Sequence, residues 1–224
     1  MVIQAFPPVE LADLNGFLAL GGDLEVDSLL LAYKSGIFPW PSDPGHLAWF
    51  APPKRTVLFL KDAHISKSLQ KARKRREYSY QCNTNFAEIL AECAKLKNRG
   101  NQEGTWITPQ MQRAYLNLHH AGYCHCFGCY HNHNLIGGLY GVSIGKMFAG
   151  ESMFYRKTNA SKLTLCFLID FLKEQGVDWI DCQVMTPLLK SFGAVQIERE
   201  KFMHLLTVAI NQTPINFPVH EKHG

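Results

Sequence analysis

The sequence predicts an α+β protein, with a small N-terminal domain at residues 1–60 and a larger C-terminal domain at residues 61–224. Three observations lead to this prediction. Of the 224 residues, 46% are hydrophobic and 19% are charged, which allows a sizeable core and excludes a disordered chain. Seven of the eleven prolines fall before residue 54. Strand patterns alternate with helix patterns mainly after residue 123.

The first half of the chain is predicted to be helical between irregular segments. An apolar stretch at residues 28–34 has helical character, Asp27 or Ser28 would cap it, and Gly36 would end it. Prolines follow this stretch, as is typical of loops. Apolar residues recur at helical spacing in three further segments: 64–76, 85–97 and 108–121.

The second half carries the clearest succession of elements. We expect strands at 123–130, 135–144 and 146–154, a buried helix at 160–174, a strand at 177–184, a short helix at 187–192, and strands or mixed elements to residue 210. Asn159 or Ser161 would cap the buried helix. This order matches the core of an acetyltransferase-like (GNAT-type) fold, in which helices flank a mixed sheet.

Neither a membrane span nor an export signal is expected. No stretch approaches the roughly 18 apolar residues of a membrane helix, and the first ten residues lack the features of a signal peptide. We therefore expect a cytoplasmic protein that does not bind membranes. Its seven cysteines would then be reduced.

Cysteine and histidine are crowded into one predicted hairpin: Cys124, His125, Cys126, Cys129, His131 and His133. Zinc needs about four nitrogen or sulfur ligands in tetrahedral geometry, so a zinc site is one interpretation. Side chains alternate along a strand, however, which works against convergence of these groups on one ion. We therefore expect thiols without a bound metal.

Positive charge is concentrated in a basic segment, residues 67–76, although the formal net charge is only +4. Its cations are Lys67, Lys71, Arg73, Lys74, Arg75 and Arg76. A solvated helix face and a surface that contacts phosphate groups both fit this pattern. The second would bind a polyanion with a steep salt dependence.

A carboxylate and an amide mark the end of the predicted strand at 177–184. Asp181 and Gln183 would share one face, because side chains alternate along a strand. The apolar face would carry Ile180, Cys182 and Val184. Three other segments are rich in glycine or polar residues near predicted strand or helix ends: 137–141, 148–154 and 159–162. Glycines at 137–141 would allow a bulge or a close backbone approach.

The turn before the buried helix argues against coenzyme A. Acetyltransferases of this fold bind its pyrophosphate on a glycine-rich turn at a helix N-terminus. The corresponding turn here, residues 155–160, contains no glycine. Another activated acyl donor is therefore expected.

These segments carry a resemblance to the bacterial leucyl/phenylalanyl-tRNA–protein transferases, which extends over residues 6–202. The similar segments follow the order of that family. They are 18–24 (LALGGDL), 36–40 (GIFPW), 64–66 (HIS), 105–107 (TWI), 137–141, 148–154, 159–162 and 181–183 (DCQ). The resemblance implies transfer of Leu or Phe, and less often Met, from aminoacyl-tRNA to proteins that begin with Arg or Lys. This transfer would mark them for degradation. We expect a monomer without a cofactor.

The resemblance also assigns site residues. The catalytic residues would be Asp181, Gln183 and Glu151. The terminal adenosine of the tRNA would stack on Trp40 and Trp106, a contact that needs no readout of base edges. The amino-acid side chain would enter a pocket lined by Leu139, Met153 and Leu165. The basic segment would meet the acceptor stem of the tRNA.

Within this scheme, the carbonyl oxygen of Gln183 would orient the attacking amine, and Asp181 would orient Gln183 or take a proton. Glu151 or Asp181 could also pair with the cationic side chain of the acceptor. The chain departs from the family at Gly128, where Glu is usual, and at Leu188, where His is frequent. Two other functions stay open: a coenzyme A-dependent N-acetyltransferase, and a non-catalytic module that binds RNA or zinc.

Overall fold

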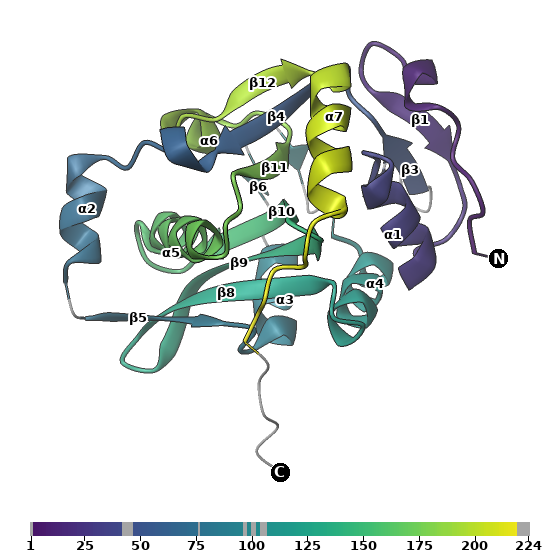
Figure 1. The fold of residues 1–224 in the computed structure, drawn as a ribbon. Helices are drawn as coiled ribbons and strands as arrows, with labels where there is room; N and C mark the ends of the chain where they lie inside the picture. Colours follow the sequence, from purple (N-terminus) through teal and green to yellow (C-terminus); the bar gives the residue numbers. More distant parts are fainter. Residues whose placement is uncertain are drawn as a thin grey trace.

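A computed structural model describes residues 2–41, 47–75, 77–95, 98–99, 102–103 and 107–218. It confirms the α+β prediction: a small sheet lies beside a seven-stranded mixed sheet that is flanked by helices (Figure 1). Two of the predicted site residues, Arg76 and Trp106, lie outside the described residues. None of the helices in the described part of the chain has the length and apolar character that crossing a membrane requires.

The N-terminal part consists of a three-stranded antiparallel sheet and one α-helix. Its elements are η1 (Val9–Leu11), β1 (Phe17–Leu20), α1 (Val26–Lys34), β2 (Phe38–Pro41) and β3 (Leu47–Phe50), with strand order β1-β3-β2. The predicted helix at 28–34 is confirmed, but its cap was wrong. The N-cap is Glu25, and the hydroxyl of buried Ser28 instead accepts a hydrogen bond from Ile3 N at 2.9 Å.

The large sheet has the strand order β12-β4-β11-β10-β9-β8-β5. Its strands are β4 (Lys54–Phe59), β5 (Tyr78–Cys82), β8 (Cys124–His131), β9 (Asn134–Ile144), β10 (Met147–Tyr155), β11 (Trp179–Gln183) and β12 (Val195–Glu198). Neighbours are antiparallel except for β10 and β11. β4 pairs with β11 and β12, so this sheet includes residues before position 60, and the predicted domain boundary there stays a prediction.

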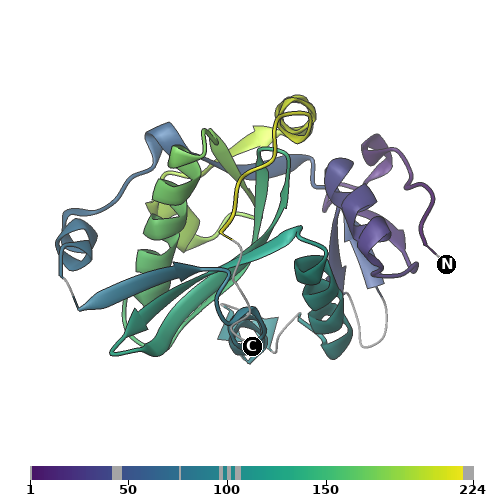
Figure 2. The ribbon, with the colours of Figure 1, turned by 60° about the horizontal axis from the view of Figure 1, so that its bottom comes forward.

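Helices cover both faces of the large sheet (Figure 2). The helices after the N-terminal part are α2 (Lys67–Arg73), α3 (Phe86–Ala94), α4 (Pro109–His120), α5 (Ala160–Glu174), α6 (Pro187–Ser191) and α7 (Arg199–Ile210). The remaining elements are a 3-10 turn, η2 (Leu60–Asp62), and a separate short strand pair, β6 (Asn98–Arg99) and β7 (Gln102–Glu103). The expectation of strands or mixed elements up to residue 210 was wrong after β12. Buried Phe202, Leu206 and Ala209 recur at helical spacing and seat α7 against the protein.

The predicted succession of three strands, a helix and a strand is confirmed as β8, β9, β10, α5 and β11, and its four strands are the middle of the large sheet. Asn132 and His133, both with positive φ, form the turn between β8 and β9. Asn159, one of the two predicted caps, occupies the N-cap position of α5, although its side chain makes no capping hydrogen bond, and Ser161 is buried inside the first turn. A Cβ atom at Gly137 would lie 2.7 Å from Ala160 Cβ, so this glycine allows α5 to begin close against β9.

Candidate active site

The large sheet opens between its two parallel strands, and the predicted catalytic residues lie at this opening. β10 and β11 share one register pair, Ala149 with Asp181. Immediately beyond it, both strands shift register against their other neighbours: Glu151 is the additional residue in β10, and Cys182 is the additional residue in β11. Such bulges re-aim side chains and are frequent beside active sites.

The bulge in β11 overturns the simple alternation expected at residues 180–184. Val184, predicted to face the core, is 48% exposed, and Cys182 is half-buried. Asp181 and Gln183 are both buried. The backbone of Gln183 takes a left-handed conformation with φ of +55°, and its N–H donates to Asp181 Oδ1 at 2.9 Å. The local turn therefore ties the two predicted catalytic residues together.

Asp181 is held by a buried arginine that the sequence analysis missed. Arg55 on β4 donates from Nε to Asp181 Oδ1 at 2.8 Å and from Nη2 to Oδ2 at 2.7 Å. The guanidinium lies between the rings of Phe38 and Phe202, at 4.6 Å from each centroid, and also donates to Gly36 O. Arg55 thus joins the N-terminal part, α7 and the catalytic strand through one side chain that is only 2% exposed.

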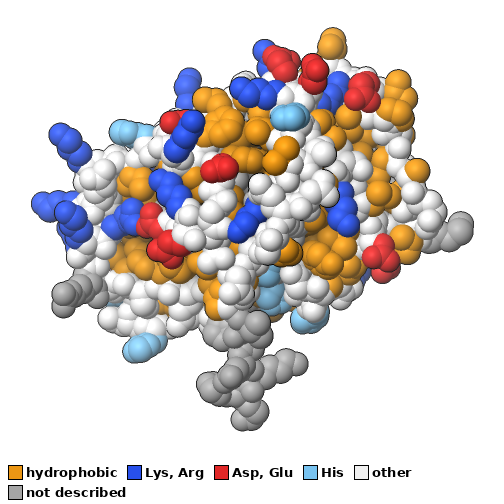
Figure 3. Space-filling model, viewed as in Figure 1, with side chains coloured by type: hydrophobic (Ala, Val, Ile, Leu, Met, Phe, Trp, Pro, Cys, Tyr) orange, Lys and Arg blue, Asp and Glu red, His pale blue; other side chains and the backbone are white. Residues whose placement is uncertain are grey.

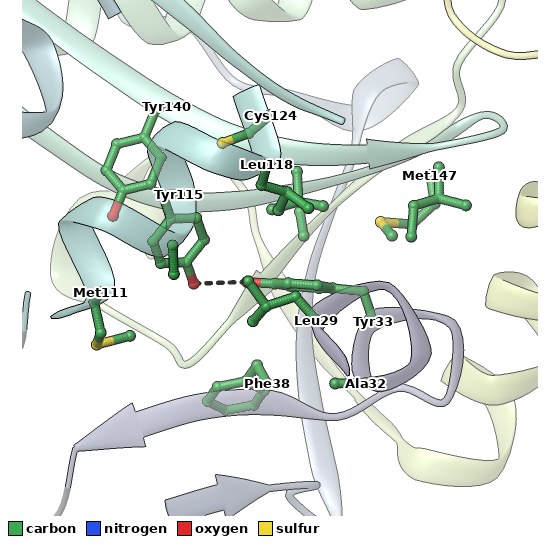
Figure 4. Packing of buried hydrophobic residues seen from close by; sticks show 14 of the residues in the cluster. Leu29, Ala32, Tyr33, Phe38, Met111, Tyr115, Leu118, Cys124, Tyr140 and Met147 are labelled. Atoms are coloured by element: carbon green, nitrogen blue, oxygen red, sulfur yellow. Dashed lines mark hydrogen bonds between the residues drawn. The ribbon is translucent and has the colours of Figure 1, made fainter. Parts of the chain in front are cut away.

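Glu151 is the second carboxylate of the site, and uncharged groups hold it. Gln183 Nε2 donates to Glu151 Oε1 at 2.7 Å, and the Tyr115 hydroxyl donates to Oε2 at 2.9 Å. The hydroxyl of Tyr33 lies 2.8 Å from that of Tyr115 (Figure 4). Burial raises the pKa of Glu151 to about 7, against the opposing effect of these hydrogen bonds.

Arg55, Tyr33 and Tyr115 were not predicted as site residues. Arg55 lies at the start of β4, shortly before the apolar residues 57–59, and this was a weak signal, because a charge that a strand buries needs a buried partner. The two tyrosines carried no comparable signal, since an aromatic residue on an apolar helix face is usually a core residue. Both are indeed buried, and only their hydroxyl groups distinguish them from the surrounding core.

The three residues predicted to form the amino-acid pocket are brought together by the fold. Leu139 and Met153 lie directly opposite each other on β9 and β10. They belong with Leu165 of α5 to one apolar cluster, which is separate from the cluster that contains Tyr33 and Tyr115. Because the bulge at Glu151 shifts the alternation along β10, Met153 joins the same cluster as Phe148, while Phe154 joins the cluster of Tyr33 and Tyr115.

Of the two predicted adenosine-binding residues, Trp40 can be placed. It is half-buried on β2, and its ring meets the edge of Phe38 at a centroid distance of 6.4 Å. Since Phe38 also contacts Arg55, the Phe38 ring links Trp40 to the guanidinium that holds Asp181. Trp106 falls outside the described residues, and its role stays a prediction.

The basic segment forms α2 and the turn after it, and its cations differ in their surroundings. Lys67, Lys71 and Lys74 are exposed, and Lys and Arg side chains crowd the edge of the molecule where α2 lies (Figure 3). Arg73 pairs with Asp170 of α5, and Arg75 lies 3.6 Å from Glu77. A hollow of about 340 Å³ between α2 and α5 is lined by eight residues: Ser68, Lys71, Ala72, Arg75, Tyr78, Thr158, Asn159 and Leu163.

The cysteines of β8 lie inside the protein. Cys124, Cys126 and Cys129 are buried, and burial raises the pKa of Cys129 to about 12. His125 stacks on Phe217 at 3.5 Å, and burial lowers its pKa to about 4. The described residues contain no group of three or more His, Cys, Asp or Glu side chains arranged for a metal ion. The expectation that no metal binds stays a prediction.

Comparisons with known proteins match one family along most of the chain. The family model for the leucyl/phenylalanyl-tRNA protein transferase matches residues 57–207, and the model for the N-terminal domain of the same enzyme matches residues 22–53. A leucyl/phenylalanyl-tRNA–protein transferase of Syntrophobacter fumaroxidans is 45% identical over 90% of this chain and 86% of its own. The enzyme of that name from Shewanella halifaxensis is 46% identical over 91% and 86%.

Solved structures show a more distant likeness. L-PGS from Bacillus licheniformis shares 13% identity over 84% of this chain and 71% of its own, with a TM-score of 0.45. A metagenomic aminoglycoside acetyltransferase shares 11% identity over 66% of this chain and 96% of its own, with a TM-score of 0.35.

Proposed function

The chain belongs to the leucyl/phenylalanyl-tRNA–protein transferase family and is an aminoacyltransferase, and from this premise we propose its substrates and its site. It transfers Leu or Phe, and less often Met, from aminoacyl-tRNA to the α-amine of proteins that begin with Arg or Lys. The product is marked for N-degron-dependent degradation. The observation that carries the proposal is the fixed position of Gln183 between two carboxylates, at the point where the sheet opens.

The reaction needs positioning more than strong activation. The donor is an ester and the product is an amide, and a free α-amine has a pKa near 8, so part of the acceptor is nucleophilic at neutral pH. Gln183 Nε2 is engaged by Glu151, while its carbonyl Oε1 accepts no hydrogen bond from the described residues. This oxygen orients the attacking amine, since a neutral amide cannot titrate but can accept a hydrogen bond. Asp181 fixes the backbone of Gln183.

The donor end occupies the apolar and aromatic surroundings of this centre. Leu139, Met153 and Leu165 line the pocket for the Leu or Phe side chain, which their common cluster supports. Trp40 and Trp106 hold the terminal adenosine. Met153→Trp should therefore reduce transfer of Phe more than transfer of Leu, because the larger donor side chain needs more of the pocket. Equal loss of both donors would contradict a steric pocket at this position.

The tRNA backbone lies along the basic segment. The exposure of Lys67, Lys71 and Lys74 and the cations that line the hollow beside α5 support this assignment. We further propose that the protein works as a monomer in the cytoplasm, without a cofactor, a metal or a membrane.

The decisive experiment offers labelled Leu-tRNA or Phe-tRNA to peptides that begin with Arg, Lys, Asp or Glu. Transfer to the Arg and Lys peptides alone is expected, and transfer to the acidic peptides would overturn the proposed acceptor class. Asp181→Ala and Gln183→Ala should lower turnover strongly, while tRNA binding stays near normal. Unchanged turnover in both variants would refute the proposed centre.

Two controls separate the alternative functions. Acetylation of the peptides by acetyl coenzyme A without tRNA would favour an N-acetyltransferase. Retention of RNA without any aminoacyl transfer would favour a binding module. Membership of the family favours aminoacyl transfer over both.

A further inference from the structure

The two carboxylates of the site differ in what holds them. Both oxygens of Asp181 accept hydrogen bonds from Arg55, and Oδ1 also accepts one from the backbone of Gln183. The guanidinium stays protonated in proteins. Asp181 therefore compensates the charge of a guanidinium that is only 2% exposed, and removing that partner would be strongly unfavourable. Asp181 is thus the carboxylate that is engaged by a buried cation.

Glu151 has no cation among its described partners. Its hydrogen-bond partners are uncharged: the Gln183 amide, the Tyr115 hydroxyl and the Tyr33 hydroxyl, which also contacts that of Tyr115. The titratable groups that face it come from four elements: Tyr33 of α1, Tyr115 of α4, Cys124 of β8 and Asp181 of β11. Burial and the charge of Asp181 raise the pKa of Glu151, and the three side-chain hydrogen bonds lower it. This carboxylate can gain and lose a proton without breaking an ion pair.

The amide of Gln183 places the amine beside this carboxylate. Its nitrogen contacts Glu151 Oε1, and its oxygen is bonded to the same carbon atom. An amine that donates to Gln183 Oε1 would therefore bind to the same amide group that contacts Glu151. The hydrogen bond from Nε2 to Glu151 orients the amide, and the backbone hydrogen bond to Asp181 fixes the main chain that carries it.

We propose that Glu151, and not Asp181, accepts the proton of the attacking amine, and that Tyr33 and Tyr115 are positioning residues which hold the carboxylate for this step. The proposal rests on the proposed function and assigns the proton transfer within it. As the amine nitrogen bonds to the carbonyl carbon of the ester, one amine proton passes to Glu151. The bond from that carbon to the ribose oxygen then breaks, and the proton returns from Glu151 to the ribose oxygen, which leaves as a hydroxyl.

The experiment measures single-turnover transfer of Phe from Phe-tRNA to a saturating Arg peptide between pH 5.5 and 9. Glu151→Gln should lower the rate by about 100-fold or more, the usual contribution of a general base, and should remove the lower limb of the profile that belongs to Glu151. An unchanged rate and profile in this variant would overturn the proposal.

A hydroxyl deletion keeps the proposal testable if Glu151→Gln does not fold. Tyr115→Phe removes a hydrogen bond to the charged form of Glu151, so the lower limb should move up by about one pH unit. Tyr80→Phe is the matched control, because Tyr80 lies on the edge strand β5 and stacks on Phe167. The acceptor amine has the same pKa in assays of the unaltered protein and of both tyrosine variants. A lower limb of the pH profile that does not move in Tyr115→Phe would therefore contradict the assignment of this limb to Glu151.

The same series separates this inference from the proposed function. If the unaltered protein transfers no amino acid at any pH, the proposed function fails. If it transfers Phe, but Glu151→Gln retains the rate and Tyr115→Phe retains the profile, only the assignment of the proton to Glu151 fails.

Discussion

The polar cluster at the opened sheet and the basic segment on α2 both depend on charge, but they use it in opposite ways. The polar cluster consists of Arg55, Asp181, Gln183, Glu151, Tyr115 and Tyr33, and each member has a fixed partner inside the protein. The basic segment keeps several lysines in solvent. A buried interaction depends on exact geometry, whereas an exposed one acts through summed and screened charge. Single substitutions should therefore have large effects in the first region and small effects in the second.

The largest effect is expected where a buried charge loses its partner. Asp181→Asn leaves the guanidinium of Arg55 uncompensated, so the free energy of unfolding should fall by about 3–5 kcal/mol, as measured by urea unfolding. Glu198→Gln breaks the exposed pair between Lys54 and Glu198 and serves as the control, with an expected loss below about 1 kcal/mol. Similar losses for both variants would remove the contrast between buried and exposed charge.

A smaller effect should follow from the titration of Glu151. Its pKa rises from 4.5 to about 7 on folding, so the stabilisation is complete below pH 4.5 and is lost as the pH rises through 7. Glu151→Gln should abolish this loss. The difference in unfolding free energy between the unaltered protein and the variant should therefore change by about 2–3 kcal/mol between pH 5 and pH 8, in favour of the variant at the higher pH. His125 titrates in both proteins and cancels in the difference. If the unfolding free energies of the two proteins change with pH in parallel, Glu151 does not cause this loss of stability.

The exposed lysines should act individually and weakly. Lys71→Ala should reduce tRNA affinity a few-fold and lower the slope of log affinity against log salt by about one, as expected for one phosphate contact. Filter binding over a series of salt concentrations measures both quantities. Lys201→Ala, an exposed lysine on α7, provides the control and should change neither value. If the two substitutions behave alike, the net charge of the protein, and not the basic segment, attracts the tRNA.

The smallest effect tests whether ion pairing withholds a cation from RNA. Asp170→Asn releases Arg73 and removes a negative charge beside α2, so tRNA affinity should rise by about twofold at low salt. Glu174→Gln removes the same charge one turn further along α5 and should have a weaker effect. The same binding assay checks both. A larger gain from Glu174→Gln would mean that local pairing of Arg73 is unimportant.

Local sequence patterns predicted most of the fold because they are physically local. The apolar helix α5 was recognisable from its continuous hydrophobic residues, and the hairpin at β8 and β9 from the polar residues of its turn. Helix α7 was missed, although Phe202, Leu206 and Ala209 have helical spacing. The predicted cap of α1 was also wrong, because Ser28 is buried and its hydroxyl accepts a hydrogen bond from the distant residue Ile3.

The sequence by itself determined the order of the elements from β8 to α6, the motifs of the family, and the identity of Asp181, Gln183 and Glu151 as candidates. Only the tertiary structure decided how these three are arranged. Bulges at Glu151 and Cys182 depend on pairing between strands that are far apart in the chain, and the simple alternation along β11 could not reveal them. The ion pair between Arg55 and Asp181 joins residues 126 positions apart. No local pattern contains that contact, and it distinguishes Asp181, which is paired with a buried cation, from Glu151, which is held by uncharged groups.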